Sequence, residues 1–191
     1  MYLGEGARSE IIAKEHFSKL RGPPCPLPLA FPNGGKFDDL IRGWVKYWNE
    51  VLMPKVPLDT NLVKALIASE SGFNPESGKK RKGRNAARGL MQLNSQAAKA
   101  LGDEKGEIKD HYVTMSGNDR YDPNLGICGG IRWLFQKQVI GSHRLGYQAS
   151  WDEAVEEYKG ILKDRLAGKA VNPRVMSIFR DFLKVLEKCK K

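Results

Sequence analysis

The sequence predicts a mainly α protein with at most a small β-hairpin, and three observations predict it. In several separate segments apolar residues recur every three or four positions, which places them on one face of a helix. Residues that favour helix caps precede most of these segments, and glycine or proline follows several of them. Alternation of the strand type is confined to one short segment. With 191 residues, 41% of them apolar, the chain is long enough to bury one core.

Residues 1–35 are interpreted as an N-terminal extension that precedes one helical domain over 36–191. Apolar residues spaced among charges predict a short amphipathic helix over 8–20. Residues 22–35 predict an irregular connector, because proline removes backbone donors and glycine weakens helices. The residues concerned are Pro23, Pro24, Pro26, Pro28, Pro32, Gly34 and Gly35.

The first helix of the domain is predicted over residues 37–53. Pro54 and Pro57 end it, because proline cannot continue a helix. Its apolar positions recur at helical spacing and are Leu40, Ile41, Trp44, Val45, Trp48 and Leu52.

Asp59 or Thr60 can cap the next helix, which carries Glu70 near its end. Glu70 follows Leu66 by four residues and Ile67 by three, so it lies on the apolar stripe of this helix. Its carboxyl is therefore predicted to point toward the core or the floor of a cleft. A carboxyl group in such surroundings loses hydration of its charged form, which favours retention of the proton that a general acid needs. The alternative is a glutamate that pairs with a nearby arginine.

The remaining elements are predicted from the residues that favour the beginnings and ends of helices. Gly102 ends one helix, Pro123 suits the first turn of another, and Ser150 is a suitable cap for a third. In chain order the prediction is a loop over 72–88, a helix over 90–101, a hairpin within 108–115, helices over 123–140 and 151–166, and a last helix opened by Asn172-Pro173.

The net charge of +10 indicates an anionic partner or only a need for solubility. Nucleic acid is not expected as the partner, since no helix-turn-helix or aromatic-interleaved basic motif accompanies the charge. No stretch approaches the roughly 20 apolar residues of a membrane span. The first residues also lack the pattern of a secretory signal.

The three cysteines, Cys25, Cys128 and Cys189, are too few for a disulfide scaffold and form no metal-type pair. At most one bridge is expected. Cys128 lies in an apolar run, so it is predicted to be a small buried residue and not a nucleophile.

Over about residues 58–160 the sequence resembles the soluble lytic transglycosylases and their relatives, the goose-type lysozymes. The resemblance implies a lysozyme-like helical domain that cleaves peptidoglycan between N-acetylmuramic acid and N-acetylglucosamine without a metal or organic cofactor. It rests on ordered blocks, namely Leu66-Ile67-Ala68-Ser69-Glu70-Ser71-Gly72-Phe73-Asn74-Pro75, Ala87-Arg88-Gly89-Leu90-Met91-Gln92-Leu93, Asp122-Pro123-Asn124-Leu125-Gly126-Ile127 and Ala154-Val155-Glu156-Glu157-Tyr158.

By this resemblance Glu70 is the catalytic acid and then the base, and Tyr158 holds its carboxyl or a substrate group by hydrogen bond. Ser77, or Ser71, would face the N-acetyl group. Gln92, with the backbone from Gly89 to Met91, would bind sugar amides and hydroxyls. For Ser77 and Met91, loop polarity and core packing are the alternative interpretations.

Two departures from the family pattern stand out. The loop between Glu70 and Gly89 is longer than usual, and its excess is basic, which indicates a solvated loop or a surface for acidic wall polymers or stem-peptide carboxylates. After Tyr158 the family commonly has asparagine, whereas this chain has Lys159 and Gly160.

The resemblance covers two reactions. A lytic transglycosylase uses the hydroxymethyl oxygen of the sugar itself and needs one carboxyl, whereas an inverting lysozyme needs a second carboxylate roughly 6.5 to 9.5 Å from the first. Asp119 is the preferred second carboxylate, and Asp122 is expected to cap the helix that starts at Pro123. The full set of candidates is Glu76, Asp103, Glu107, Asp119 and Asp122.

Such an enzyme would act in the bacterial periplasm or cell wall. The hypotheses for its origin are a phage lysin, a cell-wall opener of a secretion system, or an antibacterial toxin delivered by another route or as part of a larger protein. An immunity or inhibitor protein is a possible partner, and a monomer is expected. The alternative function is a wall-binding or scaffolding module that keeps the fold without turnover.

Overall fold

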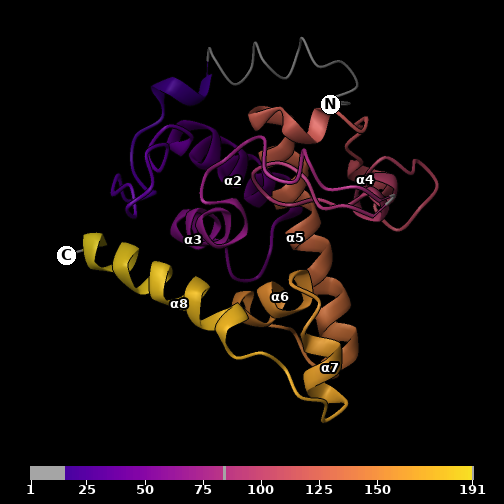
Figure 1. Cartoon of the computed structure of the whole chain (residues 1–191). Helices are drawn as coiled ribbons and strands as arrows, with labels where there is room; N and C mark the ends of the chain where they lie inside the picture. Colours follow the sequence, from indigo (N-terminus) through magenta and orange to yellow (C-terminus); the bar gives the residue numbers. More distant parts are fainter. Residues whose placement is uncertain (1–15, 84, 191) are drawn as a thin grey trace.

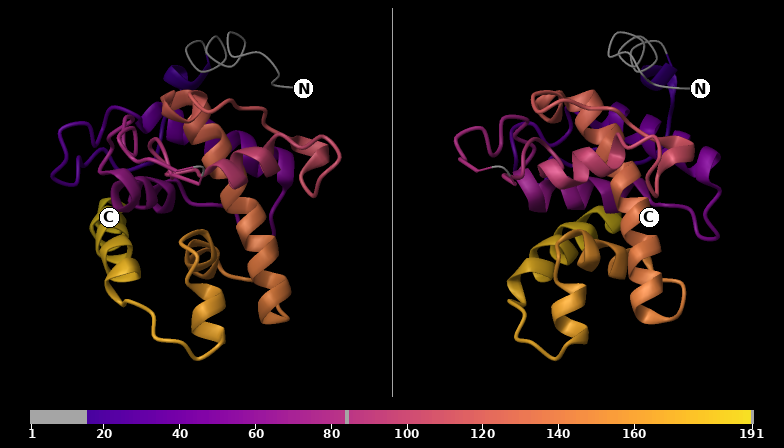
Figure 2. Two further views of the ribbon diagram at one scale, coloured as in Figure 1. Left: turned by 45° about the vertical axis from the view of Figure 1, so that its right-hand side comes forward. Right: turned by 90° about the vertical axis from the view of Figure 1, so that its right-hand side faces the viewer.

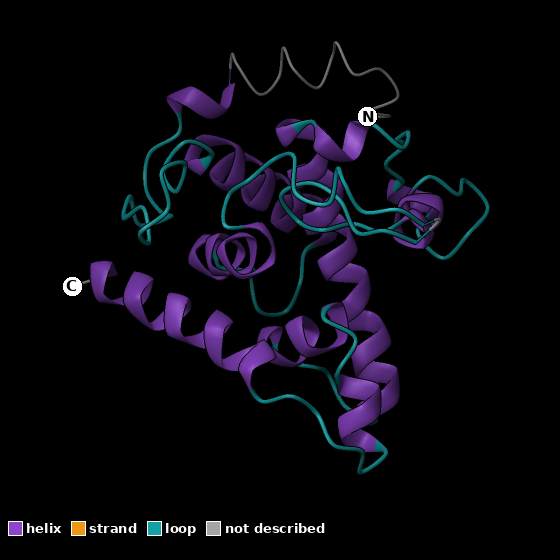
Figure 3. Cartoon of the chain, viewed as in Figure 1, coloured by secondary structure: helices purple, strands orange, loops and turns teal. Residues whose placement is uncertain are grey.

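The computed structural model describes residues 16–83 and 85–190. This part of the chain is mainly helical, as predicted, and its only strand-like pairing is an isolated bridge between Arg88 and Leu93 (Figures 1 and 3). None of its helices is long and apolar enough to cross a membrane. The predicted amphipathic helix over 8–20 lies mostly outside the described residues; within it, Phe17–Lys19 form a single 3₁₀ turn, η1.

Helix α2 (Asp38–Leu52) confirms the first predicted helix of the domain. Its apolar face is buried, and two tryptophans on that face also satisfy their ring N–H groups. Trp44 donates to the side chain of Asn124 at 2.8 Å, and Trp48 donates to the carbonyl oxygen of Cys128 at 3.0 Å. Both acceptors belong to α5 (Pro123–Leu145), so α2 and α5 are joined by hydrogen bonds as well as by packing.

Helix α3 (Thr60–Ser71), which carries Glu70, lies between α2 and α8 (Arg174–Glu187) (Figure 1). Asp59 caps it by accepting a hydrogen bond from the Asn61 N–H at 2.7 Å. Residues 60–68 are all buried. The helix ends at Gly72, whose φ of +56° is a left-handed conformation that glycine adopts without strain.

The long helix α5 runs through the height of the molecule, with α6 (Trp151–Tyr158) packed beside it (Figure 2). It begins at Pro123 as predicted but continues to Leu145, five residues beyond the predicted Ile140, and Gly146 ends it with a φ of +75°. Gly130 lies in its buried face. A Cβ atom there would be 2.2 Å from the Met91 sulfur, so this glycine lets the segment that contains Met91 approach the helix closely.

Two predictions between α3 and α5 are wrong. Helix α4 covers only Ser95–Leu101, because Asn94 is extended and caps it by accepting from the Ala97 N–H at 2.8 Å. Residues 108–115 do not form a hairpin. They contain the 3₁₀ turn η2 (Lys109–His111), and the Val113 N–H donates to the Leu101 carbonyl at 2.8 Å, so the segment pairs with the end of α4 and not with itself.

The predicted helix over 151–166 is also wrong, because it is two helices. Ser150 caps α6 as expected, but α6 ends at Tyr158 and α7 covers Leu162–Leu166. Gly160, with a φ of +75°, turns the chain between them. The last predicted helix is confirmed as α8, which begins directly after Asn172-Pro173.

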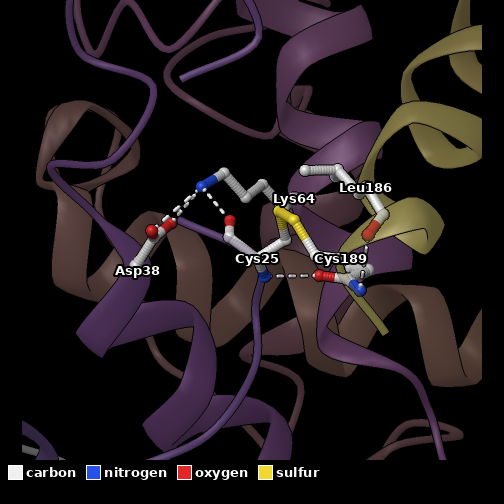
Figure 4. Close-up of a disulfide and its surroundings, with 6 residues drawn as sticks. Cys25, Asp38, Lys64, Leu186 and Cys189 are labelled. Atoms are coloured by element: carbon white, nitrogen blue, oxygen red, sulfur yellow. Dashed lines mark hydrogen bonds and ion pairs between the residues drawn. A yellow bond between two sulfur atoms is a disulfide. The ribbon is translucent and has the colours of Figure 1, made fainter. Parts of the chain in front are cut away.

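A disulfide joins Cys25 in the proline-rich connector to Cys189 after α8, and Figure 4 shows it beside the buried side chain of Lys64. The Lys64 ammonium donates to the Cys25 carbonyl at 2.7 Å and to Asp38 at 2.9 Å. The Cys25 N–H donates to the Asn61 side chain at 2.7 Å. The connector and the C-terminal end of the chain are therefore both fastened to α3. Cys128 is free and buried, as predicted.

Candidate active site

Glu70 lies in the last turn of α3, and 18% of its side chain is exposed. Its Oε1 atom forms an ion pair and hydrogen bond with the ammonium of Lys159, whose side chain is only 6% exposed. Its other oxygen, Oε2, accepts no hydrogen bond from the described part of the chain. One oxygen is therefore held by the protein, and the other is available to a ligand.

Lys159 caps the C-terminal end of α6, directly after Tyr158, and it also donates to the Ser69 hydroxyl at 3.0 Å. That hydroxyl in turn donates to the Leu66 carbonyl at 2.9 Å within α3. The ammonium thus links the ends of two helices at Glu70. The pairing of Glu70 with Lys159 is the main feature of the site that the sequence did not predict, although the departure from asparagine at this position had marked the residue.

Tyr158 donates a hydrogen bond from its hydroxyl to the carbonyl oxygen of Met91 at 2.6 Å. Burial raises the pKa of Tyr158 well above its ordinary value, and the neighbouring charge of Glu70 raises it further. The phenol therefore stays protonated and serves as a donor. It lies in the electrostatic range of Glu70, but its hydroxyl proton is directed at the backbone of the loop before α4.

The loop before α4 that contains Gly89, called the Gly89 loop below, is held in a specific shape by hydrogen bonds. The Gly89 N–H donates to the Ser77 carbonyl at 2.9 Å, and the side-chain amide of Gln92 donates to the Gly89 carbonyl at 2.7 Å. Gly89 has a φ of +75°, and a Cβ atom there would lie 1.7 Å from the carbonyl oxygen of Arg120, so no other residue fits. Arg81 from the basic loop donates to the Gln92 side-chain oxygen at 3.1 Å. The side chain of Gln92 thus stabilises the shape of the loop to which it belongs.

Arg120 stabilises the same loop through hydrogen bonds to its backbone, and the sequence did not indicate this role. Its side chain is buried, and its guanidinium donates to the carbonyls of Leu93 at 3.0 Å and Ala86 at 3.4 Å. Burial lowers its pKa. An arginine among polar residues gives no periodic signal, so only the folded arrangement could reveal it.

The other residues predicted for the site are placed as follows. The hydroxyl of Ser71 donates back to the Ile67 carbonyl at 3.2 Å, whereas that of Ser77 makes no hydrogen bond with the described residues. Met91 is buried against Gly130. Asp119 begins the 3₁₀ turn η3 (Asp119–Tyr121) and accepts from the Ser116 N–H at 2.6 Å.

No hydrogen bond or ion pair joins Asp119 to Glu70 within the described residues. The other candidate carboxylates have partners elsewhere. Asp122 caps α5 by accepting from the Leu125 N–H at 2.7 Å, as predicted. Glu107 accepts from Gln136 at 3.0 Å, Asp103 accepts from the Lys105 N–H at 3.0 Å, and Glu76 pairs with Lys79.

A cavity of about 1000 Å³ lies elsewhere, between the end of α2 and α5. It is lined by residues such as Leu52, Arg132 and Phe135. Of the residues considered for the site, only Glu107, a candidate second carboxylate, is among those that line it. Among the described residues no group of three or more histidines, cysteines, aspartates and glutamates is arranged to hold a metal ion.

A family model described as Transglycosylase SLT domain matches residues 50–158. This is more than half of the chain, and the protein therefore belongs to this family, whose activity is lytic cleavage of peptidoglycan. The match begins within α2 and ends at Tyr158, so it includes Glu70 and the Gly89 loop, and Lys159 is the first residue beyond it. No curated protein and no solved structure matches the chain.

Proposed function

We propose that this protein cleaves the β-1,4 bond between N-acetylmuramic acid and N-acetylglucosamine in peptidoglycan, with Glu70 as the general acid. The proposal rests on the position of the Glu70 carboxyl and on its hydrogen-bond partners. It ends a buried helix inside the matched segment, one of its oxygens is fixed by Lys159, and the other has no partner among the described residues.

In the proposed reaction the protonated Oε2 of Glu70 donates its proton to the oxygen of the leaving N-acetylglucosamine. The bond from that oxygen to the anomeric carbon breaks, and positive charge grows on the muramic acid ring. The hydroxymethyl oxygen of the same ring then bonds to the anomeric carbon, and its proton returns to Glu70. The products are a free N-acetylglucosamine end and a 1,6-anhydro muramic acid end.

Transglycosylation is favoured over hydrolysis because it needs only one carboxyl. Asp119 is the second carboxylate we would assign to a hydrolytic reaction. One of its oxygens accepts from the Ser116 N–H, and Asp119 does not belong to the hydrogen-bond network that joins Glu70, Lys159 and Ser69. A hydrolase would leave reducing ends in place of anhydro ends, so the products distinguish the two.

The sugar would lie along the Gly89 loop. Backbone groups from Gly89 to Met91 and the amide of Gln92 are suited to the hydroxyl and acetamido groups of the glycan. Ser77 is preferred over Ser71 for the N-acetyl group, because the Ser71 hydroxyl is already bonded to its own helix. Arg81, bound to Gln92, would extend this surface toward the carboxylates of the stem peptide.

Action in the periplasm or cell wall is supported by the disulfide between Cys25 and Cys189, since such bridges persist in oxidising compartments. A delivered antibacterial enzyme or a phage lysin would both meet that condition. An immunity or inhibitor protein would then be expected to cover the Glu70 site, and we expect the enzyme to work as a monomer.

The test is digestion of purified peptidoglycan by the wild type, by Glu70→Gln and by Glu76→Gln, with released muropeptides identified by mass spectrometry. Glu76 is an exposed carboxylate six residues away whose one ion pair among the described residues is with Lys79, so it is the matched control. We expect the wild type and Glu76→Gln to release ends lighter by one water, as anhydro sugars, and Glu70→Gln to release none. Equal release by all three proteins would refute the role of Glu70.

A wall-binding module without turnover is the second candidate, and the pairing of Glu70 with Lys159 is the observation that favours it. A carboxylate that is paired with a largely buried ammonium can also act as a binding group, without transfer of a proton. Cosedimentation with peptidoglycan, without release of muropeptides by the wild type at any pH at which it is folded, would establish this function in place of the first.

A further inference from the structure

Lys159 is the residue at the site that the family resemblance does not explain, because asparagine is common at its position. It caps the C-terminal end of α6, where its N–H donates to the Val155 carbonyl at 2.9 Å, and Gly160 then turns the chain away. Its side chain leaves this turn and becomes 94% buried at the end of α3. Burying an ammonium is costly unless it is paired and hydrogen-bonded, so this position is determined by the partners of the ammonium.

The hydrogen bonds of the Lys159 ammonium and its partners all run from donor to acceptor in one direction, away from Lys159. The ammonium has only donors, and it donates to the Ser69 hydroxyl and to Glu70 Oε1. The Ser69 hydroxyl itself donates a hydrogen bond to the Leu66 carbonyl. The oxygen of the Ser69 hydroxyl is therefore free to accept from Lys159. This hydrogen bond fixes the ammonium on α3, next to the Glu70 carboxylate.

We propose that Lys159 is a positioning residue for the reaction proposed above: it holds Glu70 Oε1 so that Oε2 carries the proton to the glycosidic oxygen, and its charge stabilises the carboxylate that remains. The inference rests on the proposed function of Glu70. It assigns Lys159 no contact with the sugar.

The groups that face Glu70 from the end of α6 are Lys159 and Tyr158. Tyr158 stays neutral because burial raises its pKa. No other charged side chain forms an ion pair with Glu70 in the described chain. Replacement of Lys159 therefore tests how the Glu70 carboxyl is positioned.

The experiment compares Lys159→Gln, which keeps a donor without charge, with Lys159→Arg, which keeps both. Lys137→Gln is the matched control, because Lys137 on α5 also forms a largely buried ion pair, with Glu157 at 3.5 Å, but forms none with Glu70 in the described chain. Muropeptide release is measured across pH and peptidoglycan concentration, and thermal unfolding reports whether each variant is folded.

We expect Lys159→Gln to lower the maximal rate by up to about 100-fold, the order of loss that follows misplacement of a catalytic group. The peptidoglycan concentration at half-maximal rate should change little, because Lys159 is assigned no contact with the sugar. Lys159→Arg should retain most of the rate, and Lys137→Gln should match the wild type at every pH.

Three outcomes would overturn the inference. A folded Lys159→Gln variant with the rate and pH profile of the wild type would make the ion pair purely structural. A variant faster than the wild type at all pH values would make Lys159 an inhibitor of Glu70. A wild type that releases nothing would refute the proposed function itself, and the positioning role with it.

Discussion

The hydroxyl of Tyr158 donates to the carbonyl oxygen of Met91 at 2.6 Å, and this bond joins the end of α6 to the loop that shapes the candidate sugar site. The same turn of chain continues into Lys159, which contacts Glu70. The end of α6 therefore connects the two halves of the site, the acid on α3 and the loop before α4.

Replacement of Tyr158 by phenylalanine should loosen this connection. The Met91 carbonyl would lose its partner, and an unsatisfied buried acceptor costs about 1–3 kcal/mol. We expect Tyr158→Phe to lower the free energy of unfolding by that amount and to reduce muropeptide release. Denaturant unfolding and the digestion assay measure the two effects.

The control for this variant is Tyr147→Phe. Tyr147 is 56% exposed, and its hydroxyl donates to Glu153 at 2.6 Å on the surface. Its replacement should change stability by no more than about 0.5 kcal/mol. Equal losses in the two variants would show that the bond to Met91 contributes nothing specific.

Gly89→Ala should distort the loop from within. The residue has a φ of +75°, and its Cβ atom would lie 1.7 Å from the Arg120 carbonyl oxygen. The backbone conformation alone costs about 1–3 kcal/mol for a residue with a side chain, and the clash must also move Arg120 or the loop. We expect a clear fall in melting temperature and loss of muropeptide release.

Gly83→Ala separates the clash from the backbone strain. Gly83 lies in the same loop with a φ of +118°, but nothing lies within 4 Å of its Cβ position. It should be less destabilising than Gly89→Ala and should keep its activity. If the two alanine variants behave alike, close packing of Gly89 on Arg120 is not what shapes the site.

Much of the helical framework could be predicted from the sequence because its signals are local. The apolar spacing of α2, the Asp59 cap of α3 and the Ser150 cap of α6 each depend on a few consecutive residues. The break after Tyr158 also had a local signal in Gly160, which the extended helix prediction ignored. The start of α4 had another in Asn94, a capping residue.

The details of the candidate site could not be predicted in the same way. The stripe on α3 predicted that Glu70 would face inward. Its contact with Lys159, 89 residues away in sequence, depends on where the fold places the end of α6 relative to α3. Gln92 adopts a φ of +49°, which is uncommon outside glycine and is stabilised here by its own bond to Gly89. Both features follow from tertiary contacts and not from periodicity.

The disulfide gives the last prediction. Cys25 and Cys189 are 164 residues apart in sequence, and the bridge fastens both the connector and the end of α8 beside Asn61 and Lys64 of the helix that carries Glu70. Loss of a native bridge of this kind costs about 2–5 kcal/mol. We therefore expect Cys25→Ser/Cys189→Ser, or the wild type in a reducing agent, to unfold at a lower denaturant concentration than the oxidised wild type.

Thiol labelling provides the control for that experiment. Burial raises the pKa of Cys128 well above its ordinary value, so its thiol should resist alkylation in the folded protein. Under non-reducing conditions the native wild type should take up no label and the denatured chain one, whereas reduction should expose the other two thiols. If the native, non-reduced protein took up label at Cys25 or Cys189, the bridge would be absent in solution, and α8 would have to be held on α3 without a covalent link.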